Sequence, residues 1–354
     1  MREQLPDFPW DALAPFGDIA RRHAGGIIDL SQGTPVDPTP DFIQKVFREA
    51  SNSPSYPVTT GTPELRAAIR KWATERLHAS GDFDVLPVIG SKELVAWLPT
   101  ILESNKVLIP EIAYPTYHVG AVIAQAQSIP VHIDAHQWPV ADLAWLNSPS
   151  NPTGRVHNAN ELRAAIAWAR TNNSILVSDE CYLEFDHSAT SLSVLSQSDG
   201  DNRNILAVHS LSKRSSMAGY RAAFMVGDGG LIAKILDLRK HAGMMVPLPV
   251  QKAMTAALSD DVHVAEQRAR YNFRREAIRP ALEAVGFRIE FSNSGLYLWC
   301  TRDEDAWTSV EWLAHRGILA TPGSFYGAAG SRYIRIALTA TDAHINDAVQ
   351  RLRA

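Results

Sequence analysis

The feature that most constrains the fold is an alternation of short β-rich runs with amphipathic helical patterns between residues 107 and 241. The β-rich runs are Val107–Pro110, Ile129–Asp134, Leu143–Ser148, Ile175–Asp179, Ile205–Ser210 and Ala222–Gly227. Helical spacing of apolar residues spans 116–127, 160–171 and 231–241. Several of the runs are apolar without clean alternation, which is typical of strands covered on both faces. The alternation therefore predicts a mostly parallel α/β sheet sandwiched by helices.

The pattern changes near residue 261, where strands and helices follow one another at shorter intervals. We expect a long charged helix from Val262 to about Val285, strands at 287–291, 296–300 and 333–338, a helix at 307–316 and a terminal helix from 342. The first 40 residues are rich in Pro and Gly and hold one extended piece, Gly26–Leu30. This change predicts a second, smaller α+β domain.

Composition excludes several classes of function. The 354-residue chain carries 34 Lys and Arg against 38 Asp and Glu, and this balance gives no electrostatic reason to expect nucleic acid or a membrane as a partner. The two cysteines, Cys181 and Cys300, have no CxxC spacing, so we expect no disulfide framework. The 12 histidines lack metal-ligand spacing, and no apolar run reaches the length of about 18 residues that a membrane span requires. We therefore expect a cytoplasmic protein without a metal site.

Polar clusters follow three of the β-rich runs and a further apolar run that ends at Val88-Ile89. The clusters are Gly90–Glu93, Asn147–Gly154, Asp179–Tyr182 and Ser210–Lys213. In an open α/β sheet, ligands bind at the carboxyl ends of the strands. Each cluster alone is more often a turn, a helix cap or a solvated loop. The four clusters together, in this order and at equivalent strand ends, indicate one functional site.

The run Ser210–Arg221 resembles the lysine signature of class I aminotransferases, the fold-type-I enzymes that use pyridoxal phosphate (PLP). In that family the Lys and the Arg stand eight residues apart, as Lys213 and Arg221 do. The resemblance continues in order through Leu30–Pro35, Pro110–Tyr117, Asn151–Gly154, Asp179–Tyr182, Thr321–Gly327 and Tyr333–Leu338. It implies a large PLP-binding domain at residues 41–270 with a mostly parallel seven-stranded sheet. The smaller α+β domain would combine an N-terminal arm, residues 1–40, with residues 271–354.

The resemblance assigns the reactive end of PLP to five residues. Lys213 matches the amine that holds the cofactor covalently and then shuttles a proton, and we expect desolvation to lower its pKa. Asp179 matches the carboxylate that keeps the pyridine nitrogen protonated. Tyr182 and Asn151 match the donors to the 3′ oxygen of the ring, and Tyr117 matches the aromatic residue that stacks on it.

The phosphate dianion of PLP requires backbone N–H groups at a helix start, together with hydroxyl groups and a cation. Ser91 and Lys92 match the helix-start amides of the family, while Ser210 supplies a hydroxyl group and Arg221 the cation. Tyr56 resembles the tyrosine that reaches the phosphate of the neighbouring subunit. That match implies a homodimer with shared active sites.

Substrate binding is implied by a further match. Arg335 matches the arginine that clamps the substrate α-carboxylate, and Gly33 and Asn151 match contacts near it. The implied substrates are small amino acids and 2-oxo acids. The segments Leu5–Asp11, Ile28–Pro40 and Ile112–Tyr117 resemble the actinobacterial N-succinyldiaminopimelate aminotransferases of lysine and diaminopimelate biosynthesis, whose amino donor is glutamate.

Three alternatives stay open at this point. One is an aminotransferase for another amino acid, such as aspartate or an aromatic one, and the second is a PLP C–S or β-lyase on the same scaffold. The third is a non-catalytic module, which would have no physical need for Lys213, Asp179 and Arg335 together. A second carboxylate on the substrate would require basic residues at the mouth of the site. Candidates by charge alone are Arg21, Arg22 and Arg239.

Overall fold

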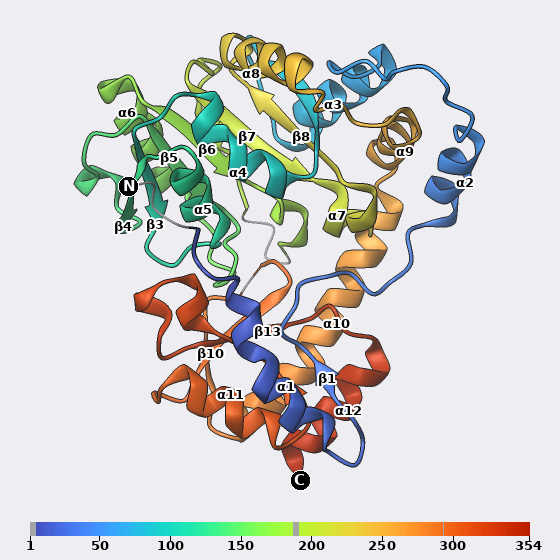
Figure 1. The fold of residues 1–354 in the computed structure, drawn as a ribbon, viewed down its shortest axis with the longest axis vertical. Helices are drawn as coiled ribbons and strands as arrows, with labels where there is room; N and C mark the ends of the chain where they lie inside the picture. The colour runs from blue at the N-terminus through green and yellow to red at the C-terminus, as the bar shows by residue number, and fades with distance from the viewer. Residues whose placement is uncertain (1–4, 187–190, 293) are drawn as a thin grey trace.

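The alternating segments form a seven-stranded sheet in the computed structural model, which describes residues 5–186, 191–292 and 294–354 (Figure 1). The strand order is β2 (Asp84–Ile89), β8 (Ala222–Gly227), β7 (Ile205–Ser210), β6 (Ile175–Asp179), β5 (Leu143–Asn147), β3 (Lys106–Pro110) and β4 (Gln127–Val131). Neighbouring strands are parallel except at β8, which is antiparallel to both β2 and β7. The predicted mostly parallel sheet is confirmed.

Helices cover both faces of this sheet. One face packs against α3 (Pro63–Arg76), α6 (Ala159–Asn172) and α9 (Leu248–Leu258), and the other against α4 (Ser91–Ile101), α5 (Thr116–Ile123) and α8 (Gly229–Ala242). The sequence specifies these helices locally. In α6, for example, Asn158 and Glu161 form a capping box that satisfies N–H groups at the helix start. The sandwich of helices around the sheet is therefore as predicted.

A smaller unit lies beside the large one (Figure 1). Its antiparallel sheet has the order β12 (Thr321–Pro322), β13 (Ile334–Ala337), β10 (Tyr297–Thr301) and β9 (Arg288–Glu290). The helices α1 (Ala14–Arg21), α10 (Val262–Ala284), α11 (Ala306–Ala314) and α12 (Asp342–Arg353) contribute to the same core. A two-stranded parallel sheet joins β1 (Ile28–Asp29) to β11 (Ile318–Leu319). This pairing brings the N-terminal segment onto the C-terminal part of the chain.

Some element boundaries differ from those that the sequence predicts. Helix α5 ends at Ile123, and Gln125 has a φ of 58°, so β4 begins at Gln127 rather than Ile129. The helices α1, α2 (Asp41–Glu49) and α9 were not predicted, and α2 packs on α9. Short 3₁₀ helices occur at Pro9–Leu13 (η1), Ala135–Gln137 (η2), Leu183–Phe185 (η3), Val194–Gln197 (η4), Ala218–Tyr220 (η5), Gly323–Tyr326 (η6) and Ala328–Gly330 (η7).

The expected domain boundary at residue 270 falls inside α10, which runs unbroken from one unit to the other. The division at residues 40 and 270 therefore stays a prediction. Among the described residues, no helix is long and apolar enough to cross a membrane.

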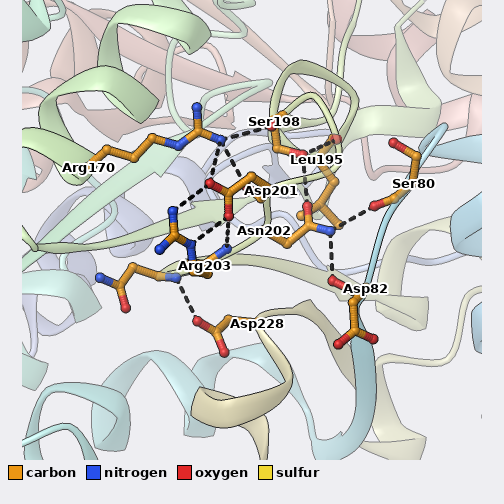
Figure 2. Close-up of polar contacts among 10 residues, drawn as sticks. Ser80, Asp82, Arg170, Leu195, Ser198, Asp201, Asn202, Arg203 and Asp228 are labelled. Atoms are coloured by element: carbon orange, nitrogen blue, oxygen red, sulfur yellow. Dashed lines mark hydrogen bonds and ion pairs between the residues drawn. The ribbon is translucent and has the colours of Figure 1, made fainter.

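A buried polar network fixes the edge of the large sheet (Figure 2). The side-chain amide of Asn202 donates to the carbonyl oxygens of Ser80 at 2.8 Å and Asp82 at 3.0 Å. Its oxygen accepts the Ser198 hydroxyl at 2.8 Å. Residues 80–82 directly precede β2, so the network anchors the first end of this strand. Gly90 follows its other end.

The substitution Asn202→Ala is expected to lower the free energy of unfolding by about 2 kcal/mol, because the carbonyls of Ser80 and Asp82 lose a donor and the buried Ser198 hydroxyl loses one of its two acceptors. Denaturant unfolding measures this change. The control is Asn172→Ala, since Asn172 makes one bond to the Trp168 carbonyl at a helix end and its loss is expected to cost less than about 1 kcal/mol. Equal losses for the two variants would contradict the anchoring role of Asn202.

Candidate active site

The carboxyl ends of β5, β6 and β7 meet at one edge of the large sheet, as the polar clusters predict. Asn147, the last residue of β5, donates from its amide to the carbonyl oxygen of Asp179 at 3.0 Å and accepts the N–H of Asn151 at 2.7 Å. Strand β2 pairs antiparallel with β8 and is therefore parallel to the other strands. Gly90, which follows β2, thus lies at the same edge.

Asp179 is a buried carboxylate with neutral partners. The Tyr117 hydroxyl donates to its Oδ2 at 2.8 Å, and the Cys181 N–H donates to its Oδ1 at 3.2 Å. Burial raises the pKa of Asp179. Among the described residues, no Lys, Arg or His lies within ion-pair distance of it. A carboxylate in this state is suited to accept a charged hydrogen bond from a protonated ring nitrogen.

The structure changes the expected role of Tyr117. Its side chain has 0% exposure, stacks on Trp145 with ring centroids 4.9 Å apart and donates to Asp179. Because protein atoms cover both of its faces, it cannot stack on a cofactor ring, and that assignment is wrong. Tyr114 is partly exposed and lies edge-to-face with Tyr117 at 5.9 Å. The segment Tyr114–Tyr117 contains two tyrosines, and the sequence alone did not separate the helical, buried one from the loop residue.

Lys213 lies on α7 (Leu211–Arg214), a short helix that Ser210 caps at the end of β7. Its ammonium group donates to the carbonyl oxygen of Gly33. Burial lowers the pKa of Lys213 to about 8, and the positive charge of Arg335 acts in the same direction. The amine is therefore available as a nucleophile and base near neutral pH.

An anion site forms where Arg221 approaches the start of α4. Gly90 has a φ of 80°, and a Cβ built on it would lie 2.3 Å from Nη2 of Arg221. Only glycine leaves room for the guanidinium here. Arg221 is exposed, and its Nη1 donates to the Ala218 carbonyl at 2.8 Å. The N–H groups of Ser91 and Lys92 belong to the first turn of α4 and have no helical partner, so this cradle suits a phosphate group.

The side chain of Arg335 links the small unit to the large one through hydrogen bonds. It is 2% exposed on β13, and its Nη1 donates to Oδ1 of Asn151 at 2.9 Å. Its Nη2 donates to the Ser31 carbonyl at 2.6 Å, and its Nε is buried without a partner among the described residues. The ring of Tyr297 lies 4.0 Å from Cζ. The predicted pair of Arg335 and Asn151, 184 residues apart, is thus in direct contact.

Tyr297 is a site residue that the sequence analysis missed. Its hydroxyl lies 3.1 Å from the hydroxyl of Tyr182, which places Tyr182 at the same junction. A Cβ on Gly33 would lie 1.9 Å from the Tyr297 hydroxyl, so glycine is required at position 33. Tyr297 sits in a buried run, Leu296–Cys300, and its sequence signal is that of an ordinary core strand.

The remaining candidates lie outside this group. Tyr56 is 92% exposed in the single chain. Arg239 is fully buried and pairs through both Nη atoms with Glu93, at 3.0 and 3.1 Å, so the structure removes it as a substrate ligand. Arg21 and Arg22 stand at the far end of α1, which packs on α11. Within the described ranges, no cluster of three or more His, Cys, Asp or Glu could hold a metal ion.

The site thus combines a lysine of lowered pKa, a buried carboxylate, an anion cradle and an inter-unit arginine. The family model for aminotransferases of class I and II matches residues 25–352. The chain belongs to this family. It is a PLP-dependent aminotransferase, and the chemistry of the residues fits this cofactor, because the described donors to Asp179 are neutral and Arg221 lies at the N-terminus of α4, where a phosphate group can bind.

The individual relatives do not identify the substrate of this aminotransferase. A probable aminotransferase of Mycobacterium tuberculosis is 51% identical over 98% of this chain and 85% of its own length. The 4-dedimethylamino-4-oxo-anhydrotetracycline transaminase of Streptomyces rimosus is 49% identical over 99% of this chain and 100% of its own. The solved structure of a probable N-succinyldiaminopimelate aminotransferase from Thermus thermophilus has a TM-score of 0.89, at 25% identity over 98% of this chain and 99% of that one.

The rate at which the cofactor-free aminotransferase combines with PLP is expected to rise with pH, with a midpoint of about 8. The reason is that only the neutral amine of Lys213 attacks an aldehyde. Arg335→Gln removes a neighbouring positive charge and is expected to move the midpoint upward. Absorbance at a series of pH values measures both midpoints. A wild-type midpoint at the value of an ordinary lysine, or no shift in the variant, would contradict this reading of the site.

Proposed function

We propose that this aminotransferase moves an amino group between glutamate and the 2-oxo acid that corresponds to N-succinyl-LL-2,6-diaminopimelate. The observation that carries the proposal is Arg335, a buried guanidinium that contacts both units of the chain and whose Nε has no partner within the described ranges. A 2-oxo acid and an amino acid share one α-carboxylate, which is the group that such an arginine binds.

The residues of the site divide the work of the reaction. When bound, PLP supplies an aldehyde that bonds the amine and a ring that takes up electrons as the Cα proton leaves. Lys213 is the group that would act as the base for the Cα proton of the substrate and then as the acid that returns it. Asp179 holds the proton at the ring nitrogen, and Tyr117 holds Asp179. Tyr114, rather than Tyr117, is the residue that we propose packs against the ring.

The other proposed cofactor contacts come from the family resemblance. Tyr182 and Asn151 would donate to the 3′ oxygen, and Arg221 would pair with the phosphate. Ser91 and Lys92 contribute the amides of the first turn of α4. Ser210, which caps α7, adds its hydroxyl to the phosphate site, and Gly33 contributes its backbone beside the substrate.

The finer substrate assignment has two supports. The chain resembles N-succinyldiaminopimelate aminotransferases in three segments, and a solved structure of that description shares its fold. A competing substrate is a ring ketone such as the one named for the Streptomyces relative, because that relative is 49% identical over its whole length. A ring ketone without an α-carboxylate would leave Arg335 unused in that half of the reaction, which favours the 2-oxo acid.

A panel of acceptors with glutamate as the donor tests the assignment. Formation of 2-oxoglutarate is measured with N-succinyl-2-amino-6-oxopimelate, oxaloacetate, phenylpyruvate and 4-oxo-anhydrotetracycline. We expect kcat/KM for the succinylated acceptor to exceed the others at least about tenfold, which corresponds to about 1.4 kcal/mol of transition-state binding. Equal or higher values for another acceptor would reject the assignment while leaving the aminotransferase intact.

A parallel reaction with a cysteine thioether as the substrate tests the lyase alternative. A C–S or β-lyase would release ammonia and pyruvate from a cysteine thioether, whereas the proposed enzyme returns 2-oxoglutarate with no free ammonia. Both glutamate and 2-oxoglutarate are cytoplasmic metabolites, and we propose that the reaction takes place in that compartment.

We also propose that the working unit is a homodimer in which Tyr56 of one protomer contacts the phosphate site of its partner. The support is the exposure of this tyrosine, at 92% in the single chain, beside the exposed Val58. A large aromatic side chain that is almost fully exposed in the single chain is more typical of a protein interface than of a free surface.

Mixing two inactive variants tests the shared site. Lys213→Ala and Tyr56→Ala are unfolded, mixed in equal amounts and refolded together. A hybrid dimer then contains one site with both native residues, so the mixture is expected to recover about one quarter of wild-type activity. If Tyr56 served its own chain, no hybrid site would be complete and the mixture would stay inactive.

A further inference from the structure

Each of the three residues after Lys213 is held by a different part of the chain. Arg214 is 3% exposed, forms an ion pair with Glu184 and donates to the Ala257 carbonyl at 3.0 Å. The carbonyl of Ser216 accepts the Thr39 hydroxyl at 2.6 Å. The segment 211–217, the Lys213 loop, is therefore fixed from several sides.

The middle anchor of the loop is a chain of three side chains. The hydroxyl of Ser215 lies 2.9 Å from Nε2 of His263, and Nδ1 of His263 lies 2.5 Å from Oδ1 of Asp260. The N–H of His263 also donates to Asp260 at 3.0 Å. Phe42 packs edge-to-face on the imidazole at 5.5 Å. The chain joins the Lys213 loop to the first turn of α10, the helix that runs into the small unit.

These contacts define the state of the imidazole. With a carboxylate at Nδ1, the ring proton belongs on Nδ1, and Nε2 is left to accept the Ser215 hydroxyl. Burial lowers the pKa of His263, while Asp260 and Glu184 act against this and Arg214 acts with it. The neutral ring with this one tautomer is the form that satisfies both neighbours.

The distances between Ser215, His263 and Asp260 are also those of a Ser–His–Asp hydrolase triad. These three residues line a cavity of about 400 Å³. Ser215 is 1% exposed, however, so its hydroxyl has no surface to present to a substrate. A nucleophile must reach the reacting carbonyl, whereas an anchor only has to reach its partner. The geometry therefore fits an anchor.

We propose that His263 is a positioning residue for Lys213. Asp260 fixes the imidazole, the imidazole fixes Ser215, and Ser215 holds the backbone two residues beyond Lys213, so that the amine stays in its buried position against Gly33. The proposal rests on the role of Lys213 in the proposed function. It adds a residue outside the site that acts on the reaction through the loop.

The test uses Ser215→Ala, which removes only the hydroxyl, and His263→Phe, which removes both bonds and keeps an aromatic ring against Phe42. The measured quantity is the pH midpoint for PLP uptake by the cofactor-free protein. In both variants water enters around a looser loop, so the midpoint is expected to rise from about 8 toward 10.5. Uptake at pH 7 should then slow about threefold to tenfold. His263→Gln offers an amide oxygen to Ser215 and should recover part of the loss.

The matched control is Ser198→Ala. Ser198 is a fully buried serine whose hydroxyl lies 2.9 Å from the Leu195 carbonyl oxygen and 2.8 Å from the side-chain oxygen of Asn202, in the network of Figure 2 rather than at the Lys213 loop. It should lose stability without a change in the midpoint. A wild-type midpoint in Ser215→Ala, with the same stability loss as the control, would overturn the positioning role. A wild-type protein whose uptake has no midpoint near 8 would instead overturn the assignment of Lys213.

Discussion

The rest of the site depends on the burial of one charged group, the guanidinium of Arg335. The guanidinium carries a permanent positive charge at a position that is 2% exposed, and the two oxygens that accept its hydrogen bonds among the described residues, on Asn151 and Ser31, are both neutral. A charge without a counter-ion in such a place costs several kcal/mol of desolvation. A substrate carboxylate repays that cost because it supplies the missing negative charge. The small unit therefore packs on the large one in a state that favours an anionic ligand.

The same charge reaches Lys213. Arg335 adds to the effect of burial in lowering the pKa of the lysine to about 8. Asp179 is an acidic residue that is buried among neutral donors, and this burial raises its pKa. Among the residues that the structure describes, the site thus has cations without an anionic partner at Arg335 and Arg221, and a carboxylate without a cationic partner at Asp179. PLP and an amino acid carry the complementary charges for both.

The sequence predicted those parts of the molecule that local rules determine. Turn chemistry and apolar runs located the strands, and the carboxyl-end rule located Asp179 and Lys213 at one edge of the sheet. Helical phase was harder, because Tyr114 and Tyr117 are three residues apart and only the start of α5 at Thr116 decides which is buried.

Contacts between distant segments left weaker traces in the sequence. Tyr297 reads as a core residue of a strand, yet it determines why position 33 must be glycine. Arg239 reads as a free cation, yet a partner 146 residues away, Glu93, neutralises it. Such pairings depend on how elements far apart in the sequence pack in space, which no local pattern encodes.

Chemical trapping of the cofactor tests the central claim most directly, namely that one lysine at this strand end holds PLP. The purified protein is loaded with PLP, reduced with borohydride and digested, and the labelled peptide is sequenced by mass spectrometry. The expected result is a single label on Lys213, lost when glutamate is added before reduction. A label on Lys92 or another lysine, or a label that glutamate does not remove, would contradict it.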